Sequence, residues 1–77
     1  MTHELVTISP EILAGTPVFK GTRVPVESLF EHLEAGANIE EFLGDFPSVK
    51  REQVTKILAL AESVLRTNLK LLHESAA

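Results

Sequence analysis

The sequence predicts a mainly α-helical fold in which a short N-terminal β element precedes three helices, the last of them long. All four glycines and all four prolines lie before residue 48, where they separate short β-prone or helical segments. From residue 48 onward neither occurs, and apolar residues recur at helical spacing. With 77 residues, of which 44% are hydrophobic and 23% charged, the chain is expected to form one domain over residues 1–77.

The β element is expected over residues 5–24. Residues 5–8 (Leu-Val-Thr-Ile) are β-prone and end at Ser9-Pro10, because proline cannot donate a ladder hydrogen bond. Farther along, β-branched or aromatic residues at 17–19 and 22–24 flank Lys20-Gly21, and a glycine there can adopt the positive φ of a tight turn. The pattern predicts a short strand followed by a tight hairpin or an extended β-arm.

Two short helices are predicted next, over residues 25–35 and 38–45. Pro25 suits a first helical turn, and Gly36 ends the first helix. Asn38 is a good N-cap with Glu41 three positions on, close to a capping box. Both segments carry apolar residues at helical spacing, namely Val26, Leu29, Phe30 and Leu33 in the first and Ile39, Phe42, Leu43 and Phe46 in the second.

The third helix is predicted over residues 51–73. Its 23 residues span about 34 Å, which is longer than the two short helices can cover, so its C-terminal end is expected to project. Exposed apolar surface on so small a protein usually marks an interface, although a frayed tail or a stripe that folds back on the β-arm is the alternative. The expected residues of a dimer or partner interface are Val64, Leu65, Arg66, Leu69, Lys70 and Leu72.

Charge is distributed unevenly along the chain. The net charge of −4 argues against a protein that coats nucleic acid through its overall field. Residues 25–48 hold six acids and no lysine or arginine, whereas residues 49–73 hold five bases against two acids. This pattern fits either a solvated surface with internal ion pairing or a basic face for an anionic partner.

Several classes of site are absent from the sequence. The lack of cysteine excludes disulfides, zinc fingers, iron–sulfur clusters and thiol catalysis, and leaves oligomerisation, such as a dimer, as the expected aid to stability. His3, His32 and His73 lie far apart, so no metal site, cofactor or catalytic residue is predicted. The longest apolar run, residues 57–61, is too short for a membrane span, and no signal peptide is recognisable. We therefore expect a cytoplasmic protein that is not an enzyme.

The order of the helices permits a helix-turn-helix, in which the last helix presents its N-terminal residues to the major groove. Apolar positions along this helix leave Gln53 and Lys56 pointing outward, with Lys50 and Arg51 at its start. Such side chains can read bases and hold phosphates. The predicted DNA-binding residues are therefore Lys50, Arg51, Gln53 and Lys56, unless these cations are ordinary solvated surface.

Four segments resemble the small family catalogued as domain of unknown function 433 (DUF433). They are Pro10–Leu13, Gly15–Val26, Ala35–Ala37 and Phe46–Pro47, and the run Gly-Thr-Arg-Val-Pro-Val after Pro-Val-Phe-Lys is the most specific. The resemblance implies a homeodomain-like three-helix fold, of the helix-turn-helix type, with a small β element.

Members of this family are similar to the VapB class of antitoxins in type II toxin–antitoxin pairs. The resemblance implies that the chain neutralises a cognate PIN-like ribonuclease toxin by binding it, and represses its own operon by binding operator DNA. Two alternatives stay open. In the first, the chain is a stand-alone dimeric DNA-binding transcriptional regulator. In the second, it is a protein-interaction adaptor that does not bind DNA.

The resemblance does not identify functional residues, and only its hairpin motif, Gly21-Thr22-Arg23, is carried over, which we interpret as structural. Gly21 then supplies the turn conformation, and Arg23 pairs with a carboxylate of a helix. The competing interpretation is that Lys20 and Arg23 contact DNA phosphate or the partner. The family typically has Thr or Ser where Lys50 stands, so this chain lacks the usual cap of the third helix.

Overall fold

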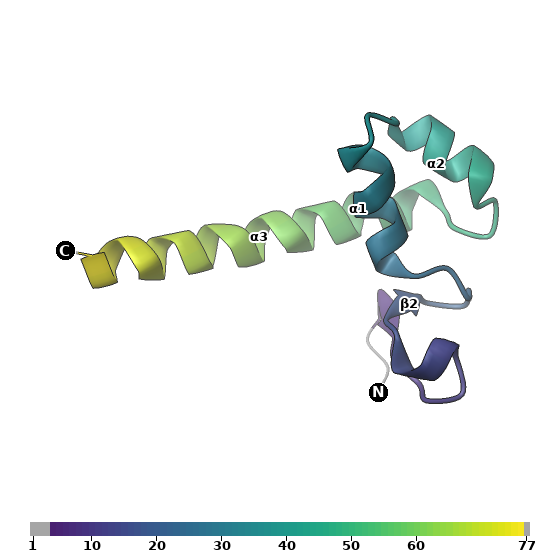
Figure 1. The fold of residues 1–77 in the computed structure, drawn as a ribbon, viewed down its shortest axis with the longest axis horizontal. Coiled ribbons are helices and arrows are strands. Elements are labelled where there is room, and N and C mark those ends of the chain that lie inside the picture. Colours follow the sequence, from purple (N-terminus) through teal and green to yellow (C-terminus); the bar gives the residue numbers. More distant parts are fainter. Residues whose placement is uncertain (1–3, 77) are drawn as a thin grey trace.

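The computed structural model describes the backbone of residues 4–76 and the side chains up to residue 72. In chain order the elements are β1 (Val6–Thr7), β2 (Val18–Phe19), α1 (Val26–Glu34), α2 (Ile39–Asp45) and α3 (Arg51–Ala76), with a 3-10 turn (Leu13–Gly15) between the strands. The mainly helical class, the three helices and the small N-terminal β element are confirmed (Figure 1).

The β element is a two-stranded antiparallel sheet, and a tight turn follows its second strand. Val6 pairs with Phe19, and Thr7 pairs with Val18. At the turn, the Thr22 amide donates to the Phe19 carbonyl at 3.0 Å, and Gly21 has the expected positive φ of 79°. The Phe19 amide donates to the Val24 carbonyl at 3.0 Å, so residues on both sides of Lys20-Gly21 are also paired, as the hairpin prediction required.

Local signals fix both short helices close to their expected ends. α1 is one residue shorter than predicted at each end and is followed by Gly36, whose φ is 92°. α2 begins after Asn38, where the predicted capping box forms. The Asn38 side chain accepts from the Glu41 amide at 2.8 Å, and the Glu41 carboxylate accepts from the Asn38 amide at 3.0 Å.

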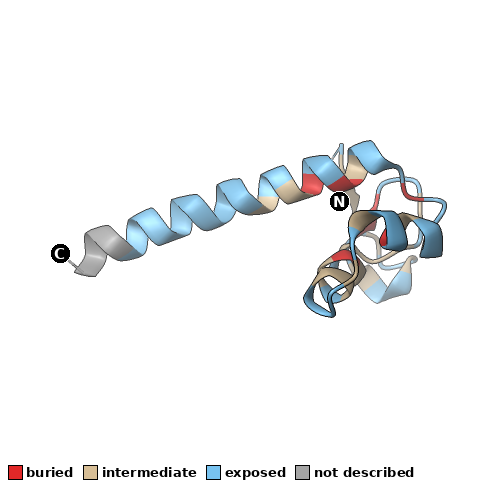
Figure 2. Cartoon of the chain, turned by 90° about the horizontal axis from the view of Figure 1, so that it is seen from above, coloured by how far each residue is buried: buried red, intermediate tan, exposed pale blue. Residues whose placement is uncertain are grey.

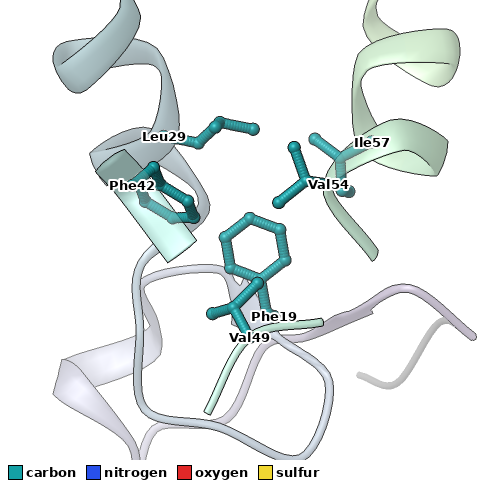
Figure 3. Close-up of a cluster of buried hydrophobic side chains, with 6 residues drawn as sticks. All are labelled: Phe19, Leu29, Phe42, Val49, Val54 and Ile57. Carbon is teal, nitrogen blue, oxygen red and sulfur yellow. The ribbon is translucent and has the colours of Figure 1, made fainter. Parts of the chain in front are cut away.

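The core is small and draws on every part of the chain up to the first third of α3. Phe19 and Phe42 meet with ring centroids 6.0 Å apart, which places the β-turn against α2. Figure 3 shows the buried side chains converging from the sheet, the helices and the segment before α3. They are Phe19, Leu29, Phe42, Val49, Val54 and Ile57.

His32 joins α1 to α2, a role that the sequence did not reveal. Its Nδ1 lies 2.8 Å from the Ser28 carbonyl, and its Nε2 lies 3.2 Å from a carboxylate oxygen of Asp45. The ring also packs edge-on against Phe42 and Phe46. His32 is therefore a structural link between two helices.

α3 leaves the body as a single projecting helix, as its length predicted (Figure 1). Val54 and Ile57 are buried, whereas every side chain from residue 62 to residue 72 is exposed (Figure 2). The helix continues to Ala76, three residues beyond the predicted end, because neither glycine nor proline interrupts it. The alternative in which this stripe folds back on the β element is wrong.

Candidate interaction surfaces

The projecting part of α3 presents an unusual amount of apolar side-chain surface. We define residues 60–72 as the arm. Its large aliphatic side chains are between 43% and 65% exposed, although leucine and valine are usually among the most buried residue types. They are Leu60, Val64, Leu65, Leu69, Leu71 and Leu72.

These side chains form two adjacent rows along the arm. At about 100° per residue, the apolar residues occupy roughly half of the helix circumference. One row, which we call the Val64 seam, continues the line of buried Ile57 and consists of Leu60, Val64 and Leu71. The other, which we call the Leu65 seam, continues the line of Leu58 and consists of Leu65, Leu69 and Leu72.

The polar side of the arm carries two cations with different surroundings. Arg66 makes a bidentate ion pair with Glu62 one turn earlier, at 2.7 and 2.9 Å. Lys70 is exposed and pairs with no described carboxylate. The charge of Lys70 is therefore not neutralised by any described side chain.

An apolar groove of about 420 Å³ opens where α3 leaves the body. The body contributes Val6, Pro17, Val26 and Phe30 to this groove, and α3 contributes Ile57, Leu60, Ala61, Val64, Leu65 and Asn68. A smaller apolar hollow adjoins it at Pro17, Val26 and Phe30 and has Glu27 at its rim. The sequence does not predict this groove, because its lining comes from the β element, α1 and α3, which lie far apart in the chain.

The residues predicted to bind DNA lie together at the start of α3, but three of the four are engaged within the chain. Arg51 forms an ion pair with Glu40 of α2. Lys56 forms an ion pair with Glu52 at 2.8 Å. This contact lowers the pKa of the Glu52 carboxyl, through the hydrogen bond and charge of Lys56, and raises the pKa of the Lys56 amine.

Gln53 uses both ends of its side-chain amide inside the protein. Its Nε2 donates to the Lys20 carbonyl at 2.9 Å, and its Oε1 accepts from the Lys50 amide at 2.9 Å. Gln53 thereby ties the β-turn to the start of α3. A base contact by this side chain requires both hydrogen bonds to be given up.

Three lysines from two segments line an open hollow of about 540 Å³ beside this tie. Lys20 comes from the β-turn, and Lys50 and Lys56 come from the start of α3. Glu4 and Glu52 lie in the same hollow and offset part of the positive charge. The cluster is accordingly basic but mixed in sign.

The Gly21-Thr22-Arg23 motif acts at the turn. The Thr22 hydroxyl donates to the Phe19 carbonyl at 2.8 Å and accepts from the Val24 amide at 3.0 Å, so Thr22 braces the hairpin. The expected pairing of Arg23 with a helix carboxylate does not form among the described residues, because Arg23 is exposed at the end of the turn and is solvated there.

Among the residues that the structure describes, no three His, Asp or Glu side chains lie close enough together to bind a metal ion. His3 and the side chain of His73 lie outside that part. None of the described helices has the length and apolar character needed to cross a membrane.

Comparisons with known proteins place the body of the chain in a family. An uncharacterized protein of Sinorhizobium fredii (strain NGR234), y4eO, is 43% identical over 61 residues, which cover 79% of this chain and 28% of that relative. Comparison with solved structures gives no match. The matching family model covers residues 6–61 and ends where α3 loses its last partial burial. The chain belongs to the family described as "Protein of unknown function (DUF433)".

Proposed function

We propose that the protein is the antitoxin of a type II toxin–antitoxin pair and neutralises a PIN-like ribonuclease toxin by binding it through the arm. The observation that carries this proposal is the arm itself, with six half-exposed aliphatic side chains on a helix that extends past its own core. A helix with an open apolar face is suited to lie in a groove of a partner protein. The resemblance to VapB-like antitoxins supplies the class of partner.

The two sides of the arm suit such a toxin in different ways. The Leu65 seam supplies apolar anchors for a groove. PIN-like nucleases work with clustered carboxylates and a divalent metal, so a cation of the antitoxin can occupy the position of that metal. Lys70 serves this purpose better than Arg66, because Arg66 is already paired with Glu62.

The proposal is tested by purifying the tagged chain from its native organism and identifying stoichiometric partners by mass spectrometry. We expect a small PIN-like nuclease whose RNA cleavage stops when the full chain is added. A chain that ends at Ser63 keeps all described buried side chains and should fold, yet should not inhibit the nuclease. Leu69→Glu should abolish inhibition, and Ser63→Glu on the polar side is its matched control. Inhibition by the shortened chain would refute the proposal.

We further propose that the start of α3 contacts operator DNA, so that the antitoxin represses its own operon. The lysine-lined hollow supports this role, and Lys20 and Lys50 are the cations there with no described ion-pair partner. Lys50→Ala should weaken binding to the upstream DNA and reduce the slope of log affinity against log salt by about 1. DNA binding without any nuclease partner would indicate the stand-alone regulator, and no DNA binding would indicate the adaptor.

A further inference from the structure

The Val64 seam and the groove are both apolar, and neither is covered by the part of the chain that the structure describes. The seam runs outward from the groove along the same helix, so the outer part of the arm lies beyond the reach of its own body. The arm cannot bend back, because α3 contains neither the glycine nor the proline at which helices usually kink. Any arm that enters the groove therefore comes from another molecule.

We propose that this molecule is a second copy of the chain, and that two arms pack antiparallel about a two-fold axis. Each Val64 seam then lies against the other, and the outer end of each arm enters the partner's groove between α3 and α1. Each copy supplies one arm and one groove, so a closed pair covers both surfaces twice. In the dimer Leu69 and Leu72 stay outside the Val64 contact, whereas Leu65 lines the groove, so the inference goes beyond the proposed toxin binding and shares only Leu65 with it.

The apolar area available to such a pair indicates a weak dimer. The three side chains of the Val64 seam, each about half exposed, present on the order of 250 Å² of apolar surface. The lining of the groove adds to this, but the total stays below the roughly 800 Å² per partner of a standard stable interface, so the pair should dissociate on dilution. The arm is long enough, because Leu60 to Leu72 spans about 18 Å of helix.

The charges around the two surfaces are complementary in the antiparallel arrangement. Glu27 is exposed on α1 at the rim of the hollow that adjoins the groove. Lys70 is exposed near the outer end of the arm, and neither residue is paired within the described chain. Seating the arm of one copy in the groove of the other brings Lys70 toward Glu27. A parallel arrangement keeps these charges at opposite ends of the interface.

The first test is the mass of the purified chain by size exclusion with light scattering and refractive-index detection, since the chain has no tryptophan or tyrosine. We expect twice the chain mass, falling on dilution. Val64→Glu buries two carboxylates in the pair and should raise the dimer Kd by about 100-fold or more. Ser63→Glu, one residue away on the polar side, is the matched control and should stay dimeric. Circular dichroism shows whether both variants keep the helical content of the parent chain.

The second test is charge reversal between the two copies. Lys70→Glu and Glu27→Lys should each raise the dimer Kd by roughly 5- to 10-fold, because the contact occurs twice in the pair. The double variant should return close to the parent value. Three outcomes would each overturn the proposal. The parent chain stays monomeric at about 100 μM, Val64→Glu and Ser63→Glu have equal effects on the dimer Kd, or the double variant does not recover the parent Kd. These assays use the chain alone, so they fail or succeed independently of nuclease inhibition.

Discussion

The side-chain amide of Gln53 should stabilise the fold, and the substitution Gln53→Ala tests this. Two hydrogen bonds are lost, one to the Lys20 carbonyl and one to the Lys50 amide, both 2.9 Å long. Each is worth about 0.5–1.5 kcal/mol net, and both sites are open to water, which replaces part of the loss. Alanine has a higher helix propensity than glutamine, which restores about 0.4 kcal/mol of stability.

The expected net loss is therefore about 1 kcal/mol, which corresponds to a decrease in Tm of roughly 4–8 °C for a domain of this size. Thermal unfolding followed by circular dichroism measures it, at one fixed protein concentration so that association contributes equally to each variant. Ser63→Ala, on the exposed side of the same helix, is the control and should lie within about 0.5 kcal/mol of the parent chain. A Gln53→Ala variant as stable as this control would refute the structural role and leave the side chain available for base contact.

Three further predictions concern the core, a cap and an ion pair. Phe42→Ala should cost about 3–5 kcal/mol and abolish a cooperative unfolding transition, because a domain this small holds little more in total, whereas Phe42→Leu should keep the transition. Asn38→Ala should lower stability by about 1 kcal/mol in urea unfolding. Lys56→Met should raise the pKa of Glu52 toward its ordinary value in an NMR titration. Because folding lowers the pKa of Glu52, the pair contributes to the stability of the fold at pH values above the unfolded pKa of Glu52. This contribution fades as the pH falls through the folded pKa, and Lys56→Met should remove the dependence.

The parts of the fold that the sequence predicted well are those set by neighbours in the chain. A capping box needs only Asn38 and Glu41 three positions apart, and a tight turn needs only Gly21 between β-prone segments. The length of α3 follows from the absence of any helix breaker after residue 48. Position 50 holds neither Thr nor Ser, yet α3 begins at Arg51, because the Gln53 side chain accepts a hydrogen bond from the Lys50 amide.

The features that the sequence did not reveal depend on contacts between distant segments. Nothing in the sequence around His32 indicates that Asp45, thirteen residues away, will meet its ring. The positive φ values of Leu13 and Ala14, 47° and 54°, occur at residue types that rarely adopt them, so propensity argues against the turn that forms there. The sequence predicts DNA binding by Gln53 because this side chain faces outward in a helical-wheel projection. Such a projection does not show that the β-turn lies beside Gln53.

The arm and the body have different sources of stability, and the proposed partners would supply what the arm lacks. Residues 6–61 hold every buried core side chain among those described, and the family model covers the same stretch. Beyond residue 61 the described part of the helix has its own hydrogen bonds and the Glu62–Arg66 pair, and isolated helices of about 12–15 residues are marginal in water. Its large aliphatic side chains stay more than half exposed. Whatever covers the two seams therefore supplies the free energy that keeps the arm helical, which couples the order of the arm to its partners.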